Sequence, residues 1–134
     1  MSDIRSQART IWDTIYERVG EDLRAVIRYE PTNSESVMRD DVRSQYEPDG
    51  TRAIVDQTIV SQLNDRRQES AFDVGRLNAV VRVFEDAWIV SCPETVARKS
   101  GVLVSIDRNG DAASVTDLEW CIRYLEGGFG SVVQ

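Results

Sequence analysis

The chain has 134 residues, of which 23 are acidic and 16 basic, so its formal net charge is -7. Fifteen of the basic residues are arginine, Lys99 is the single lysine, and there is no histidine. An excess of carboxylates with almost no lysine suits a salt-rich cytoplasm, where counterions screen the self-repulsion of an acidic surface. The arginines are scattered among acids and form no basic face, so we expect no nucleic-acid partner.

The missing histidine removes the usual proton shuttle and the commonest metal ligand. Cys92 and Cys121 lie in a strand-like and a helix-like run, which predicts two buried, reduced thiols, with a disulfide between them as the less favoured alternative. Two such widely separated cysteines cannot make a zinc cluster by themselves, so we expect no metal and no cofactor. No apolar run approaches the roughly 18 residues of a membrane span, and the N-terminus lacks the apolar core of a signal peptide. The sequence therefore predicts a cytoplasmic protein without a membrane partner.

The N-terminal third predicts a helix and then a strand. Between residues 3 and 19, apolar side chains recur at the spacing of an amphipathic helix, which Gly20 ends. Residues 23–30 alternate between two faces and are closed by Pro31, as in a strand.

The next stretch predicts helices. Ser34 or Ser36 could cap a short helix that carries Met38, Val42 and Tyr46, and a turn follows at residues 47–50. There is no clear sign of a strand between residues 31 and 48.

Thr51 could cap a helix over residues 51–67 in which Val55, Ile59, Gln62 and Leu63 share one side. Two short strands around the apolar pairs of this stretch are the alternative.

The C-terminal half predicts a meander and a final helix. Residues 76–84, 88–92 and 101–106 have the period of strands and follow one another as a three-stranded antiparallel meander. Thr116 and Glu119 stand at capping-box spacing, so a helix is expected to begin there and to end at residues 127–128. Residues 129–134 are expected to form a loose tail of a single domain that spans residues 1–134.

One loop has an alternating pattern of oxygen ligands. Asp107, Asn109 and Asp111 are spaced like the first ligands of a calcium loop, but Ala112 and Leu118 stand where that loop needs glycine and glutamate. A turn between strand and helix is the better interpretation.

Together the elements predict an α+β fold, a two-layer antiparallel sheet with terminal and middle helices in the order α-β-α-α-β-β-β-α. This order resembles the roadblock and profilin-like class and also PAS-type sensor cores. The segments at residues 37–42, 81–85 and 101–105 are similar to small haloarchaeal proteins of uncharacterised function. Roadblock-like domains pair into dimers and scaffold small GTPases or motility machinery, so the resemblance implies a similar role here.

Aromatic residues are the candidate interaction site. Trp12 and Tyr16 lie four residues apart on the first helix, as do Trp120 and Tyr124 on the last, and Phe129 follows in the tail. Filling of the core explains such residues in a small domain, whereas a partner-binding surface would use the same residue types as anchors.

Three functional hypotheses follow. The first is a non-enzymatic interaction or regulatory module with no catalytic residues, a homodimer that acts through its sheet edge or its aromatic helices. The second is a PAS-like ligand sensor with Arg28, Arg82 and Trp88 near a pocket between sheet and helices. The third, weakest, is an enzyme dependent on a divalent metal.

Overall fold

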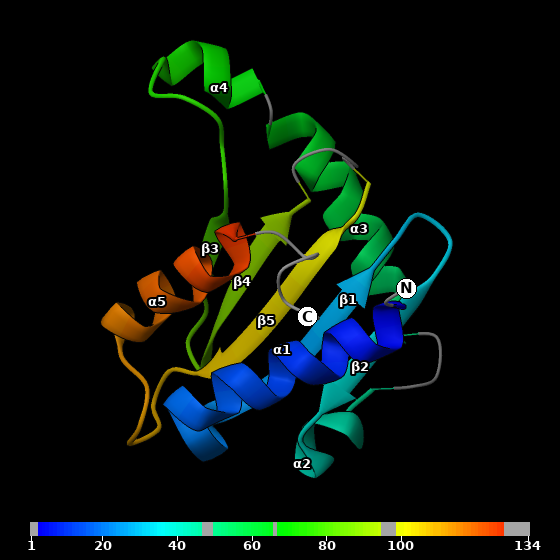
Figure 1. The fold of residues 1–134 in the computed structure, drawn as a ribbon, viewed down its shortest axis with the longest axis vertical. Helices are drawn as coiled ribbons and strands as arrows, with labels where there is room; N and C mark the ends of the chain where they lie inside the picture. The colour runs from blue at the N-terminus through cyan, green and yellow to red at the C-terminus, as the bar shows by residue number, and fades with distance from the viewer. Residues whose placement is uncertain (1–2, 47–49, 66, 95–98, 128–134) are drawn as a thin grey trace.

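The computed structural model describes residues 3–46, 50–65, 67–94 and 99–127 (Figure 1). Its elements, in chain order, are α1 (Ile4–Val19), η1 (Gly20–Asp22), β1 (Leu23–Tyr29), β2 (Ser34–Met38), α2 (Asp40–Arg43), α3 (Gly50–Asp65), α4 (Arg67–Phe72), β3 (Val80–Val83), β4 (Ala87–Pro93), β5 (Gly101–Asp107) and α5 (Val115–Glu126). None of the described helices is long and apolar enough to cross a membrane. The predicted tail, with Phe129, lies outside the described residues.

The strands form one sheet in the order β2-β1-β5-β4-β3, with every neighbouring pair antiparallel. The predicted meander is confirmed, because β3, β4 and β5 pair in sequence. Strand β1 lies beside β5, its partner from the far end of the chain, and this pairing joins the N-terminal elements to the meander. The α+β class and the antiparallel sheet are therefore confirmed.

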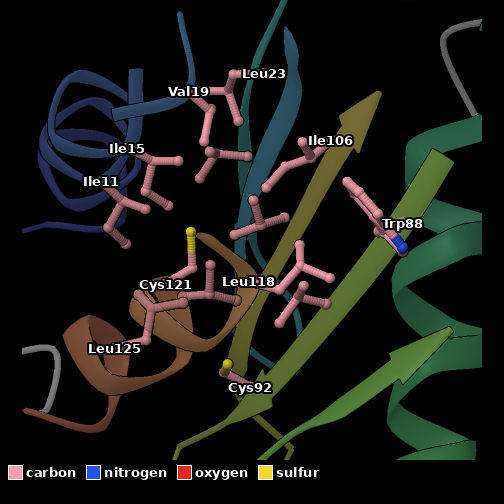
Figure 2. Close-up of a cluster of buried hydrophobic side chains, with 14 residues drawn as sticks. Ile11, Ile15, Val19, Leu23, Trp88, Cys92, Ile106, Leu118, Cys121 and Leu125 are labelled. Carbon is pink, nitrogen blue, oxygen red and sulfur yellow. The ribbon is translucent and has the colours of Figure 1, made fainter. Parts of the chain in front are cut away.

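Helices cover both faces of the sheet, so the expected two layers are three (Figure 1). On one face, α1 and α5 pack on a core that Figure 2 shows, with Ile11, Ile15, Cys121 and Leu125 pointing at the strands. On the other face, a smaller core surrounds Val55 of α3. Helix α3 is thus confirmed as a helix, although Leu63, expected on its buried side, is exposed.

Residues 34–38, expected at the start of a short helix, form strand β2 instead. They pair with β1 from Tyr29 opposite Ser34 to Ala25 opposite Met38, and a tight turn joins the strands, in which the N–H of Glu30 donates to the carbonyl of Asn33 at 2.7 Å. Most of β2 is polar and only Met38 is buried, so its own pattern is weak. Pairing along β1 decides its structure, and only the four residues of α2 remain helical.

The last helix starts two residues earlier than predicted. Ser114 is its N-cap and forms a capping box with Asp117, in place of the expected Thr116 and Glu119. Strand β3 is also shorter than expected, since it begins at Val80.

An irregularity in β1 changes the face to which its first residue points. The pairing with β5 shifts between Leu23 and Ala25, which marks a bulge at Arg24. As a result, Leu23 joins the core under α1 together with Val26, whereas Ala25 joins the core under α3.

A buried carboxylate joins the start of β1 to the loop before α5. Asp22 in η1 accepts hydrogen bonds from the backbone N–H groups of Ala112 and Ala113, both at 2.8 Å. A Cβ at Gly110 would fall 2.0 Å from an oxygen of this carboxylate, so the close approach depends on glycine.

Gly101 lies at a second crowded position, and its replacement tests the β1 and β5 pairing. A Cβ there would lie 2.6 Å from both the carbonyl of Cys92 and the hydroxyl of Tyr29. We expect Gly101→Ala to lower the free energy of unfolding by about 1–3 kcal/mol, as overpacking does. Urea denaturation measures the change.

Gly50→Ala is the matched control, because a Cβ at that position would make an ordinary contact of 3.5 Å with Tyr46. It should leave stability unchanged or slightly raised. Equal stabilities of the two variants would contradict the crowding at Gly101.

Candidate interaction surfaces

The aromatic residues predicted as partner anchors form stacked pairs on α1 and α5. The ring centroids of Trp12 and Tyr16 are 6.2 Å apart, and those of Trp120 and Tyr124 are 5.6 Å apart. The guanidinium of Arg18 lies 5.0 Å from the ring centroid of Trp120, close enough for a cation–π contact.

A further polar contact ties the two helices together. Arg18 forms an ion pair with Asp117 at 2.7 Å. Burial raises the pKa of the Tyr124 hydroxyl, and the nearby Thr14 opposes that change. Burial opposes ionisation of Asp117, but the bonds from Arg18 and Ser114 bring the pKa of its carboxyl below the usual value. The aromatic side chains therefore lie along a polar seam between helices.

Most of these rings are half-buried. Trp12, Trp120 and Tyr124 pack against the core under α1 and α5, so part of each side chain contributes to the core. Tyr16 is the most open, with 38% of its surface exposed, and its hydroxyl donates to Glu21.

The three residues expected around a ligand pocket do not meet. Arg28 and Trp88 lie on the face covered by α1 and α5, whereas Arg82 lies on the α3 face, opposite Ile89. Trp88 is buried in the core, where Figure 2 shows it against the sheet. These three residues therefore do not share the expected pocket, because neighbouring residues of a strand face opposite sides of the sheet.

Arg28 is a buried arginine whose guanidinium bonds several elements of the fold to one another. Only 3% of it is exposed, and its guanidinium donates to Gln7 and to the carbonyl of Tyr29, both at 2.7 Å. It also reaches the carbonyl of Gly101 and pairs with Glu94 at 3.5 Å. Burial lowers the pKa of this arginine, and the nearby Glu94 opposes that change. These contacts secure the ends of α1, β1, β4 and β5.

The α3 face is less completely packed. Tyr29 donates its hydroxyl to Gln62, whose amide donates to the carbonyl of Ser100 at 3.2 Å, so a buried polar link fixes the C-terminal half of α3. Burial raises the pKa of the Tyr29 hydroxyl strongly, which keeps this donor protonated. Towards β3 and β4, however, α3 does not pack closely against the sheet.

The space that this leaves is a groove of about 810 Å³ between α3 and strands β3 to β5. Ala87, Ile89 and Leu103 line it from the sheet, Ile54 from the helix, and Phe84 from the hairpin end. A smaller pocket of about 130 Å³ lies near Ser61, Gln62 and Ser91. A pocket between sheet and helices was expected beside Arg28, Arg82 and Trp88, and of these three residues Arg82 lines the groove. The place of the groove under α3 could not be predicted, because the sequence does not say how closely α3 approaches each strand.

The outer edge of the sheet at β3 is a second surface; the sequence predicted interaction through a sheet edge but not which strand forms it. Strand β3 is terminal in the sheet order, and Val81 and Val83 on it are 36% and 60% exposed. The N–H of Phe84 donates to the carbonyl of Ala87 at 2.8 Å, in register with the β3 and β4 pairing. Since alternate residues of an antiparallel strand face the partner, the backbone groups of Val81 and Val83 face away from β4.

The two edges of the sheet differ in character. Strand β2, at the opposite edge, carries Ser34, Glu35 and Ser36, polar residues of the kind that discourage pairing with another chain. Strand β3 has three valines in four residues. This valine run is the signal from which the apolar edge could have been anticipated.

Both thiols are buried in the core, and the carboxylate of Asp107 is engaged in ion pairs. Burial raises the pKa of both Cys92 and Cys121 to about 12. Asp107, from the loop with alternating oxygen ligands, pairs with Arg24 at 3.4 Å and with Arg39 at 2.7 Å. Among the described residues, no group of three or more histidine, cysteine, aspartate or glutamate side chains could hold a metal ion.

Solved structures with a similar fold include two MglB proteins and a roadblock/LC7 domain. The gliding protein mglB of Thermus thermophilus matches with a TM-score of 0.64 at 8% identity, over 99% of this chain and 93% of that one. MglB of Myxococcus xanthus matches with a TM-score of 0.62 at 7% identity, over 100% and 96%. A roadblock/LC7 domain from Streptomyces avermitilis matches with a TM-score of 0.52 at 13% identity, over 94% and 97%.

At such low identity the likeness is one of fold, and it confirms the roadblock-like fold expected from the order of elements. No curated protein matches the sequence. A family model described as a domain of unknown function, DUF7522, matches residues 9–125, which is most of the chain. The chain therefore belongs to the DUF7522 family.

Proposed function

We propose that this chain is a non-enzymatic interaction or regulatory module of a salt-adapted cytoplasm and that it works as a homodimer. The observation that carries the proposal is the β3 edge, where exposed valine side chains coincide with outward-facing backbone groups. An edge of this kind is a template for pairing with another chain unless something covers it.

A second copy supplies a matching strand. Two β3 strands related by a two-fold axis would pair antiparallel, satisfy the outward N–H and C=O groups of Val81 and Val83, and bury their side chains. The same patch on both copies is self-complementary, as a symmetric dimer requires. The resemblance to roadblock-like domains, which pair into dimers, supports the same arrangement.

A regulatory role is supported by where the reactive groups lie. The thiols are buried, Arg28 is engaged within the fold, and the ionic residues near Asp107 pair with one another. The exposed apolar residues gather instead around α3, α4 and β3, including Val60, Phe72 and Val83. Surfaces of this composition serve recognition of other proteins.

A PAS-like sensor is the second candidate, and the groove under α3 is the observation in its favour. At about 810 Å³ it lies within the range of about 300–1,000 Å³ that holds a drug-sized molecule. Arg82 lines this groove, whereas Arg28 and Trp88 lie on the other face of the sheet. A sensor of this kind would therefore use Arg82 alone of the three residues.

The dimer is tested with Val83→Pro. Proline removes the outward N–H that a second β3 would need, and it leaves the N–H groups that face β4 in place. We expect light scattering in molar potassium chloride to give twice the chain mass of 15.1 kDa for the unaltered protein. Val83→Pro should raise the dimer Kd at least about tenfold, or ~1.4 kcal/mol.

Val115→Pro is the control, since Val115 is equally apolar, 69% exposed and the first residue of α5, where proline is tolerated. It should remain dimeric. If the unaltered chain is a monomer at micromolar concentration, the proposed dimer is contradicted.

The salt-adapted setting predicts that potassium chloride stabilises the fold. Raising its concentration from 0.1 M to 1 M shortens the Debye length from about 10 Å to about 3 Å, which screens repulsion within a chain of net charge -7. We expect the urea midpoint to rise over this range.

Glu17→Lys with Glu126→Lys should weaken that dependence, because each exposed acid becomes a base near a helix C-terminus. A midpoint that falls with salt, or an unchanged dependence in this variant, would argue against an electrostatic origin.

A further inference from the structure

The α4 arm, residues 67–79, presents an apolar tip to solvent. Phe72 is 69% exposed and Val74 is 86% exposed, the highest exposure among the exposed large apolar side chains. Figure 1 shows α4 at the far end of the molecule, away from the sheet, with the following segment running back to β3. Two apolar side chains in such a position cost free energy unless a partner covers them.

The shape of this tip is defined by local contacts. Glu69 accepts the backbone N–H of Asp73 on its carbonyl at 3.2 Å and that of Leu77 on its carboxylate at 2.7 Å. Asp73 and Gly75 have positive φ angles of 51° and 98°, which turn the chain on either side of Val74. The arm therefore holds its apolar residues in a set geometry.

The same chain contains a groove that matches the tip in chemistry. Ala87, Ile89 and Leu103 give its sheet side an apolar patch, beside which Arg24, Arg82 and Ser105 also line the groove. The half-exposed ring of Phe84 stands at its hairpin end. The rim beside that ring carries two exposed acids, Glu85 and Asp86. The arm carries the exposed bases Arg67 and Arg76 and an exposed acid, Asp73, between its two apolar residues. Arg82 also lines the groove, so each surface offers charged groups of both signs that the other can pair with.

Antiparallel pairing of two β3 strands would bring the arm and the groove together. In such a pair, residues that precede β3 in one copy lie beside residues that follow β3 in the other. The arm precedes β3, and the rim residues Phe84 to Asp86 follow it. A two-fold axis perpendicular to the sheet also keeps the α3 faces of both copies on the same side.

We infer that the tip of the α4 arm, Phe72 and Val74, docks in the groove between α3 and strands β3 to β5 of a second copy of this chain. The inference rests on the proposed homodimer and adds a specific contact to it. Because the dimer is symmetric, both arms dock at once and each groove is filled by the partner's arm. The occupant of the groove is then protein rather than a small ligand.

Cross-linking between two differently tagged, co-expressed chains tests the contact. One chain carries Val74→Cys and the other Phe84→Cys, so a short bismaleimide can join them only across the dimer. The native thiols are buried, with the pKa of each raised to about 12, and should react little. We expect a covalent heterodimer from this pair and none from Val74→Cys with Val115→Cys, whose new thiol lies at the start of α5.

A paired variant separates the arm contact from the dimer itself. Phe72→Ser with Val74→Ser changes only exposed side chains, so the fold should persist, as circular dichroism and the urea midpoint can verify. We expect its dimer Kd to rise about tenfold or more. Ala71→Ser, an exposed change on the same helix, is the control and should leave the Kd unchanged.

The outcomes distinguish the two proposals. A dimeric unaltered chain with no specific cross-link and an unchanged Kd for the Ser variant would overturn the arm contact alone. A monomeric unaltered chain would overturn the homodimer and the contact with it. A small molecule retained in the groove in native mass spectrometry, together with an unchanged Kd, would likewise exclude the arm and favour a sensor.

Discussion

The pairing of β1 with β5 is the constraint on which the rest of this structure depends. It joins residues 23–29 to residues 101–107, so it closes a long stretch of chain and places two strands from opposite ends at the centre of the sheet. The bulge at Arg24 turns Leu23 towards the same core as Val26, and Arg28 bonds the strand to Gln7 of α1 and to Glu94 just after β4. Once β1 is fixed beside β5, β2 can form by pairing along β1, although its own sequence is mostly polar.

Periodic segments of this fold could be predicted from the sequence, and segments shaped by their neighbours could not. Helix α1, strand β1 and the meander have strong patterns of their own and were found where expected. Strand β2 was missed because it is an edge strand with one buried residue, Met38, and is stabilised by pairing. The start of α5 was misplaced because two overlapping pairs, at Ser114 and Thr116, have similar capping potential and local geometry selects the first.

The candidate sites show the same division. The sequence shows each aromatic pair four residues apart on one helix, but it could not reveal that the rings stack or that Arg18 would join α1 to α5 through Asp117 and Trp120. Strand register, which the sequence does not specify, separates Arg82 from Arg28 and Trp88. Nor does the sequence identify the terminal strand of a sheet, so the exposed edge at β3 emerged only from the order of the strands.

The hydrogen bonds that the carboxylate of Asp22 accepts from Ala112 and Ala113 have a consequence for the motions of the molecule. This carboxylate holds the backbone just before α5, and the capping box at Ser114 and the bond from Arg18 to Asp117 strengthen the same end. We therefore expect this end of α5 to resist local opening, so that the backbone amides of Ala112 and Ala113 exchange slowly with solvent although they lie in a loop.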